Sequence, residues 1–189
     1  EYFGLRQINW ILREAALKIV DVELNEINGG SFSVTAAHLS SPIEPNASVI
    51  NSLLERETEQ GYNGLAVFDE FARQVRDSRD SMVSIISGLR AGGKRICGLG
   101  ASTKGNVLLQ YAQLDSASVE VIGDVNPDKH GCFTPGSWIP IVSEEQVLDS
   151  RPDYLLVLPW HFKSFFISSE RFIGHQLMFP LPKFEIIPR

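Results

Sequence analysis

The feature that most constrains the fold is a strand that passes into a helix through a glycine-rich turn. Residues 95–111 read RICGLGASTKGNVLLQY. An apolar strand, Ile96–Gly98, precedes the turn, and an apolar helical segment, Val107–Ala112, follows it. A junction of this kind leaves backbone N–H groups at the positive end of a helix dipole, where phosphate or carboxylate can bind. The stretch therefore predicts a strand–helix unit with an anion-binding turn.

The rest of the C-terminal part alternates between apolar strands and helices. Alternation of this kind predicts an α/β fold with a mostly parallel sheet that helices cover on both faces. The expected strands are Arg95–Leu99, Ser118–Gly123, Ile141–Ser143, Asp153–Leu158, Gln176–Phe179 and an edge strand at Phe184–Ile187, and the expected helices are Thr103–Ala112, Glu144–Leu148 and Phe162–Phe172.

The N-terminal part has a different organisation. Helical spacing of apolar residues predicts a helix over Leu5–Leu17, and two strands, Lys18–Asn25 and Phe32–Ala37, flank an Asn28-Gly29-Gly30 turn. A hairpin this short is marginal without partners, so we expect it to complete something larger. The polar, proline-bearing segment 40–46 predicts a domain boundary, and helices at residues 49–60 and 65–89 follow it.

Composition excludes some classes of partner. The chain has 189 residues and a formal net charge of −6, without a basic stripe, so nucleic acid is not expected. No apolar run approaches the roughly 20 residues of a membrane span. The two cysteines, Cys97 and Cys132, lack metal-ligand spacing, so we expect no metal, a reduced pair and a cytoplasmic location.

The glycine turn supplies the first candidate site. Its glycine spacing fits neither the dinucleotide fingerprint nor the phosphate loop of nucleotide hydrolases, since Asn106 stands where the latter has lysine. Two interpretations remain open: the glycines only permit a tight turn, or the backbone and polar side chains hold an anion. The candidate residues for anion binding are Gly100, Ser102, Thr103, Lys104, Gly105 and Asn106.

Further candidates follow the next strands. Asp124 could accept a ribose or sugar hydroxyl, or could merely cap its turn, and Lys129 with His130 could reach a diphosphate or form a solvated loop. Trp160 offers a stacking face and His161 a proton donor. The alternative for the latter pair is that Trp160 fills the core and His161 caps a helix.

Several motifs occur in one order along the chain. They are Tyr2-Phe3-Gly4-Leu5-Arg6, Asn28-Gly29-Gly30-Ser31, the turn 100–106 with Leu108-Leu109, Asp124-x-Asn126-Pro127-x-Lys129, Pro135-Gly136 before Ile139-Pro140-Ile141, and Pro152-Asp153-Tyr154 leading to Leu158-Pro159-Trp160. This order resembles the C-terminal part of the S-adenosylmethionine-dependent sugar C-methyltransferases, which act on nucleotide-linked deoxysugars. The resemblance runs from Tyr2 to about Pro182.

The resemblance implies a domain organisation. Residues 1–40 would be the closing helix and hairpin of an upstream methyltransferase domain, and residues 47–189 a Rossmann-like, doubly wound C-terminal domain that binds the nucleotide sugar. The chain begins at Glu1 directly before a helical pattern, so we expect a longer parent protein. S-adenosylmethionine, the family's zinc cysteines and its catalytic Glu-His pair would belong to the upstream part. The chain alone would therefore contain no catalytic residue and be inactive.

The chain departs from the family pattern at two places. His161 stands where the family has asparagine after Pro-Trp, and Ser164-Phe165-Phe166 replace an acidic pair. An acidic contact to the sugar is lost there, so the identity of the sugar stays open. The alternative function is a stand-alone dinucleotide- or CoA-binding module with a regulatory or oxidoreductase role, against which the glycine spacing argues.

Overall fold

The chain divides into two compact units. The structure, a computed structural model, describes residues 2–27 and 30–189. The first unit ends at Arg73 and the second begins at Gln74. Asn28 and Gly29 of the predicted hairpin turn lie outside the described residues.

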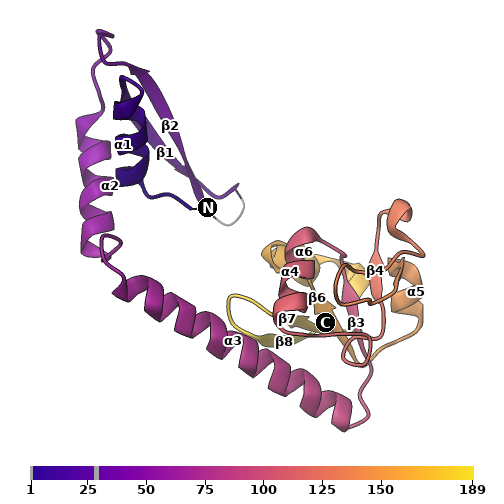
Figure 1. Ribbon diagram of the computed structural model, residues 1–189. Coiled ribbons are helices and arrows are strands. Elements are labelled where there is room, and N and C mark those ends of the chain that lie inside the picture. Colours follow the sequence, from indigo (N-terminus) through magenta and orange to yellow (C-terminus); the bar gives the residue numbers. More distant parts are fainter. Residues whose placement is uncertain (1, 28–29) are drawn as a thin grey trace. The chain divides into compact units, whose positions relative to one another are not determined.

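In the first unit, two helices pack against a hairpin (Figure 1). Helix α1 spans Leu5–Glu14, strand β1 Leu17–Asn25, strand β2 Ser31–His38 and helix α2 Ala47–Glu59. The strands are antiparallel, and Leu17 pairs with His38. Helix α1 ends before the predicted Leu17 because Ala16 adopts a φ of 57°, which turns the chain into β1.

Helix α2 belongs with the hairpin in this unit. Val49, Ile50, Leu53 and Leu54 pack against the buried side chains of Leu5, Ile19 and Val22. The Glu57 carboxylate of α2 also accepts hydrogen bonds from the backbone N–H groups of Leu5 and Arg6, which caps the start of α1. The predicted linker 40–46 thus connects two packed elements of one unit. The assignment of residues 1–40 and 47–189 to separate domains stays a prediction.

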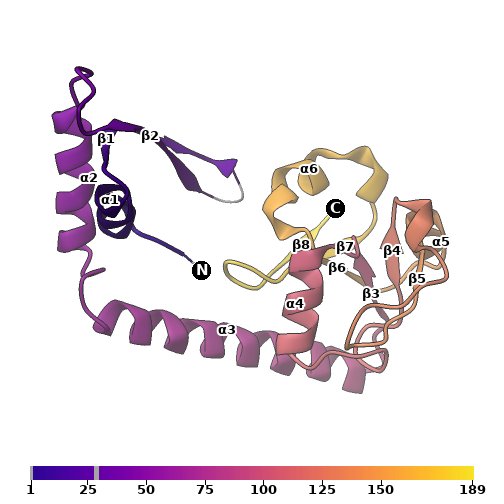
Figure 2. The ribbon, with the colours of Figure 1, turned by 45° about the horizontal axis from the view of Figure 1, so that its top comes forward.

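The second unit is built on a six-stranded sheet in the order β5-β4-β3-β6-β7-β8 (Figure 2). Neighbouring strands are parallel except at the edge, where β8 runs antiparallel to β7. The strands are β3 (Ile96–Leu99), β4 (Ile122–Asp124), β5 (Ile141–Ser143), β6 (Tyr154–Val157), β7 (Gln176–Phe179) and β8 (Glu185–Pro188). The helices are α3 (Ala66–Ala91), α4 (Thr103–Tyr111), α5 (Glu144–Asp149) and α6 (Lys163–Ser168), of which α3 begins in the first unit. Three short 3-10 turns are η2 (Pro127–Lys129), η3 (Trp160–Phe162) and η4 (Glu170–Phe172).

Helices cover both faces of this sheet. On one face, Ile96 and Met178 pack with side chains from α3 and α4. On the other, Leu99 and Phe179 pack with side chains from α5, α6 and η4. Strands buried on both sides explain the continuous apolar runs of the sequence. The predicted fold class, a Rossmann-like doubly wound and mostly parallel sheet preceded by a helix and hairpin, is confirmed.

Two predicted elements of the second unit were also wrong in their extent. The strand expected from Ser118 begins only at Ile122, because the N–H groups of Ser118 and Val119 bond back to Asp115 in a turn. The helix expected over residues 162–172 is broken at Ser169, which is extended at ψ 128° and caps the separate η4 turn through its hydroxyl.

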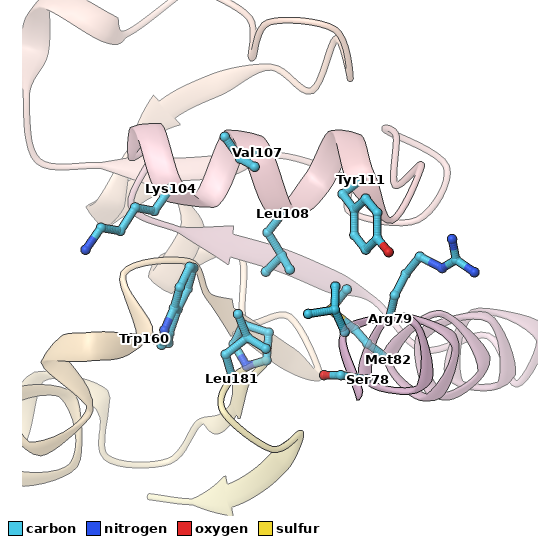
Figure 3. Close-up of a pocket in the computed structure, with 11 residues that line it drawn as sticks. Ser78, Arg79, Met82, Lys104, Val107, Leu108, Tyr111, Trp160 and Leu181 are labelled. Atoms are coloured by element: carbon cyan, nitrogen blue, oxygen red, sulfur yellow. The ribbon is translucent and has the colours of Figure 1, made fainter. Parts of the chain in front are cut away.

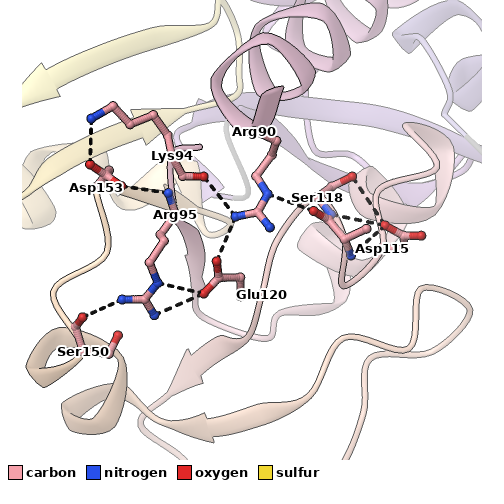
Figure 4. Close-up of polar contacts among 9 residues, drawn as sticks. Arg90, Lys94, Arg95, Asp115, Ser118, Glu120, Ser150 and Asp153 are labelled. Atoms are coloured by element: carbon pink, nitrogen blue, oxygen red, sulfur yellow. Dashed lines mark hydrogen bonds and ion pairs between the residues drawn. The ribbon is translucent and has the colours of Figure 1, made fainter. Parts of the chain in front are cut away.

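A polar network holds the amino ends of the strands together (Figure 4). Glu120 pairs with Arg90 at 2.8 Å and with Arg95 at 3.1 Å. Asp153 accepts from the backbone N–H of Arg95 at 2.8 Å and from Lys94 Nζ at 3.0 Å. These contacts join the C-terminal end of α3 to the starts of β3 and β6. In the described ranges 2–27 and 30–189, no helix has the length and apolar character needed to cross a membrane.

Candidate functional site

The candidate site lies where the winding of the sheet changes direction. From β3 the chain passes through α4 to β4 on one side, and from β5 it returns through α5 to β6 on the other side of β3. Ligands of open α/β sheets bind at the carboxyl ends of the two strands that flank such a switch point. Here those ends lead into residues 100–104 and residues 159–161, two of the segments that the sequence singled out.

Two glycines allow these segments to approach each other. Gly100 has a φ of +78°, and a Cβ atom on it would lie 2.8 Å from Pro159 Cδ. A Cβ atom on Gly105 would lie 2.6 Å from Leu158 Cβ. Both glycines are therefore required for the turn and for the packing of α4 against the end of β6. This structural role is compatible with anion binding.

The turn uses much of its own hydrogen-bonding capacity. The N–H of Ser102 donates to Gly100 O at 2.8 Å, and the N–H of Gly105 donates to the Ser102 hydroxyl at 3.1 Å, which caps α4. Within the described part of the chain, the backbone N–H groups of Thr103 and Lys104 have no acceptor, and both residues are exposed. The N–H groups open to an anion are thus fewer than the sequence predicted.

Asp124 and Lys129 bind each other beside the turn. Asp124 accepts from Ala101 N at 2.7 Å, from Asn126 N at 2.8 Å and from Lys129 Nζ at 2.9 Å. Lys129 Nζ also donates to Ala101 O at 3.0 Å. Burial would raise the pKa of Asp124, but the bonds from Asn126, Lys129 and Ala101 outweigh it and lower that pKa. The pair clamps the glycine turn, and a direct contact of either residue with substrate stays a prediction.

Lys104, Trp160 and His161 come together on the other side of the turn. Trp160 and His161 meet edge to face with ring centres 6.0 Å apart. Burial, and then the charge of Lys104, lowers the pKa of His161 below the ordinary value of an imidazole. Among the described residues no acidic side chain pairs with Lys104. The Lys104 ammonium is therefore available to an anionic ligand.

Lys104 and Trp160 also line a cavity of about 190 Å³ (Figure 3). Its other walls come from one side of α3, from the exposed and core-facing sides of α4 and from the turn between β7 and β8. They are Val75, Ser78, Arg79, Met82, Val107, Leu108, Tyr111, Pro180 and Leu181. The lining is mostly apolar. This cavity was not predicted, because its lining residues come from separate segments and give no local sequence signal.

The candidate residues thus fall into two groups around one turn. Lys104 and Trp160 share the cavity, whereas Asp124 and Lys129 share the clamp on the opposite side. Asn106 lies in the first turns of α4, and its buried side-chain oxygen has no hydrogen-bond partner in the described residues. His130, by contrast, is held by a 2.8 Å contact from its Nε2 to Asp124 O.

Comparison with known proteins agrees with this architecture. A family model described as the C-methyltransferase C-terminal domain matches residues 26–182. The chain is also similar to the C-methyltransferase NovU of Streptomyces niveus, with 33% identity over 189 positions that cover 98% of this chain. The chain spans 45% of that relative's length. The match confirms the resemblance inferred from the motifs, and the chain belongs to the family of C-methyltransferase C-terminal domains.

Proposed function

We propose that this chain is the substrate-holding part of an S-adenosylmethionine-dependent C-methyltransferase and that it binds the diphosphate of a nucleotide-linked sugar. The diphosphate would lie at the N-terminus of α4. One observation supports the proposal most strongly. The Lys104 ammonium, the free N–H groups of Thr103 and Lys104, and the Trp160 ring lie together at the switch point of the sheet. Charge-assisted hydrogen bonds to phosphate are the strongest that such a site can make.

The role of the chain in the reaction is to position the substrate. A base that removes a proton next to a sugar keto group needs a tuned pKa and close placement, and we assign that base to an upstream part of the parent protein. A substrate fixed by its diphosphate presents the sugar in one orientation, which by itself lowers the barrier to reaction. Lys104 and Trp160 are the residues we expect to contribute most.

S-adenosylmethionine is the general methyl donor of such enzymes, and we assign its binding to the upstream part as well. In doubly wound sheets that bind dinucleotides, a carboxylate at the end of the second strand commonly accepts from the adenosine ribose. Asp124 has that position, but its oxygens already accept from Ala101, Asn126 and Lys129. Three of the roughly four acceptor positions of this carboxylate are thus occupied, which weighs against an adenosine ribose at this place. The same observation weighs against a dinucleotide-binding module.

The proposal is tested by titration calorimetry of this chain with dTDP-glucose, NADH and S-adenosylmethionine. We expect binding of dTDP-glucose alone. Lys104→Ala should weaken it by about 1–3 kcal/mol, or about 5- to 150-fold, the range of a charge-assisted hydrogen bond. Lys94→Ala is the matched control, because Lys94 pairs with Asp153 at the opposite edge of the sheet. Unchanged affinity of Lys104→Ala, or tight binding of NADH, would contradict the proposal.

A further inference from the structure

We propose that the cleft between α1, β1 and α2 binds an organic anion, namely a carboxylate carried on an apolar body. The cleft lies wholly within the first compact unit, so it shares no residue with the switch point of the sheet. Its volume is about 530 Å³, within the range of roughly 300–1,000 Å³ that is typical of small-molecule sites. The inference is therefore independent of the proposed function.

Two cationic side chains line the cleft without an acidic counterpart. Arg13 comes from the last turn of α1 and Lys18 from the start of β1. Among the described residues, the Arg13 guanidinium has no hydrogen-bond or ion-pair partner. Lys18 Nζ donates to Ser41 O at 2.8 Å, which leaves ammonium donors available. None of the described residues that line the cleft is acidic, and Asp21 of β1 instead accepts from Asn46 Nδ2 at 3.1 Å.

Arg13 also has a structural role, because a cation in the last turn of a helix complements the helix dipole. That role depends on the charge of the side chain and does not use its five N–H donors. A planar guanidinium can donate two parallel hydrogen bonds to one carboxylate. A carboxylate is therefore the anion that best fits the end of the cleft at Arg13.

The remaining wall is apolar and calls for more than a bare ion. Ile19 is 4% exposed, and Ile50 and Leu54 pack against it. Leu39 and Pro45 complete the apolar part of the lining. A small inorganic anion would leave these surfaces in water, whereas an apolar acid would cover them. A cavity of about 150 Å³ can hold benzene, so this cleft has room for a ring with a short chain.

The ligand would join three elements of the first unit. Asn9 of α1 and Asn51 of α2 line the cleft beside the cations. Their carboxamides offer both donors and acceptors, so the site also accommodates a polar substituent on the ligand. A molecule that contacts α1, β1 and α2 together binds the folded unit only, and its binding should therefore stabilise that unit.

The experiment titrates the whole, isotope-labelled chain with matched ligands and follows its amide signals by nuclear magnetic resonance. The acid 3-phenylpropanoate carries its carboxylate on an aromatic body, and octanoate carries it on an aliphatic one. The alcohol 3-phenylpropan-1-ol is the neutral match of the aromatic acid. Inorganic phosphate is an anion without an apolar body.

Four variants locate the site, and a fifth is held in reserve. Arg13→Gln removes one cation of the cleft, and Arg6→Gln, on the same helix but outside the cleft, is its matched control. Ala47→Trp places a large ring in the cleft from the start of α2, and Ser52→Trp, at an exposed position of α2 outside the cleft, is its control. Asn51→Trp replaces Ala47→Trp should that variant not fold.

We expect both acids to bind, and the alcohol and phosphate to bind at least about fivefold more weakly. Arg13→Gln should weaken both acids by about fivefold and leave the alcohol unchanged, a difference that a merely structural role of Arg13 would not produce. Ala47→Trp should weaken the acids and the alcohol alike, whereas Arg6→Gln and Ser52→Trp should alter neither.

Three results would overturn the proposal. They are the absence of saturable binding of either acid up to millimolar concentrations, equal affinities for 3-phenylpropanoate and its alcohol, and unchanged binding of the acids in both Arg13→Gln and Ala47→Trp. A preference for one acid over the other would support the site and identify the apolar body as aromatic or aliphatic. The affinity for dTDP-glucose is measured at a separate unit of the chain, so the two proposals fail separately.

Discussion

Replacement of Gly105 by alanine tests whether the start of α4 is held against the end of β6. In an ordinary helix the change would stabilise the protein, since alanine is favoured over glycine by roughly 0.5–1 kcal/mol. At Gly105 the new methyl carbon would lie 2.6 Å from Leu158 Cβ and 3.0 Å from the Ser102 hydroxyl. Carbon atoms in contact are separated by about 3.5–4.0 Å, so α4 or β6 must move by about 1 Å.

The Leu158 Cβ atom cannot rotate away, because it is bonded to the backbone at the end of β6. We therefore expect Gly105→Ala to destabilise the chain by about 1–3 kcal/mol, the usual range for overpacking. Gly88→Ala is the matched control: Gly88 lies within α3, and a Cβ atom there would have no other atom within 4 Å. That variant should gain roughly 0.5–1 kcal/mol.

The two variants should thus differ by about 1.5–4 kcal/mol, with opposite signs relative to the unmodified chain. Urea unfolding followed by far-ultraviolet circular dichroism measures this difference. Thermal unfolding should show it as a separation of roughly 2–4 °C for each kcal/mol. Equal gains in stability from both substitutions would refute the reasoning, because they would mean that α4 does not need a glycine to approach Leu158.

Three other predictions concern stability. The pKa of Asp124 lies below its ordinary value of 3.8, so its ionised form stabilises the fold above that pH and ceases to do so as the pH falls through the lowered pKa. The deficit of Asp124→Asn in urea unfolding should therefore be full at pH 7 and shrink as the pH is lowered below 3.8. Ile86→Ala removes a fully buried side chain, and calorimetry should show a loss of about 2–5 kcal/mol. Glu120→Gln weakens the pairs with Arg90 and Arg95, which should lower stability by about 1 kcal/mol in low salt and by less in 1 M NaCl.

The sheet and the position of the site could be predicted from local patterns. A buried strand could be predicted from the apolar run at residues 96–99 alone, and a sharp turn from the glycines that follow it. Parallel strands end at the same edge of a sheet, so the segments that follow β3 and β6 are brought to one edge. The structure brings both to one cavity.

The cavity itself could not be predicted, because its walls come from four separate segments. Whether Met82, Leu108 and Leu181 enclose a space depends on how helices and a turn pack, and apolar residues at these positions are equally typical of a filled core. Asp124 shows a related ambiguity. An acidic residue at the end of a strand gives the same sequence signal whether or not its oxygens also accept, as they do in this chain, from a lysine and two backbone N–H groups.

The hydrogen bonds from the start of α1 to the Glu57 carboxylate of α2 limit where this chain can be shortened. A fragment that starts at Ala47 would remove α1 and the hairpin and expose the apolar side of α2, including Leu53 and Leu54, to water. Uncovered apolar helices of this kind promote aggregation. Expression of the sheet unit alone is therefore better served by a start within α3, close to Gln74, than by one at the proline-bearing segment.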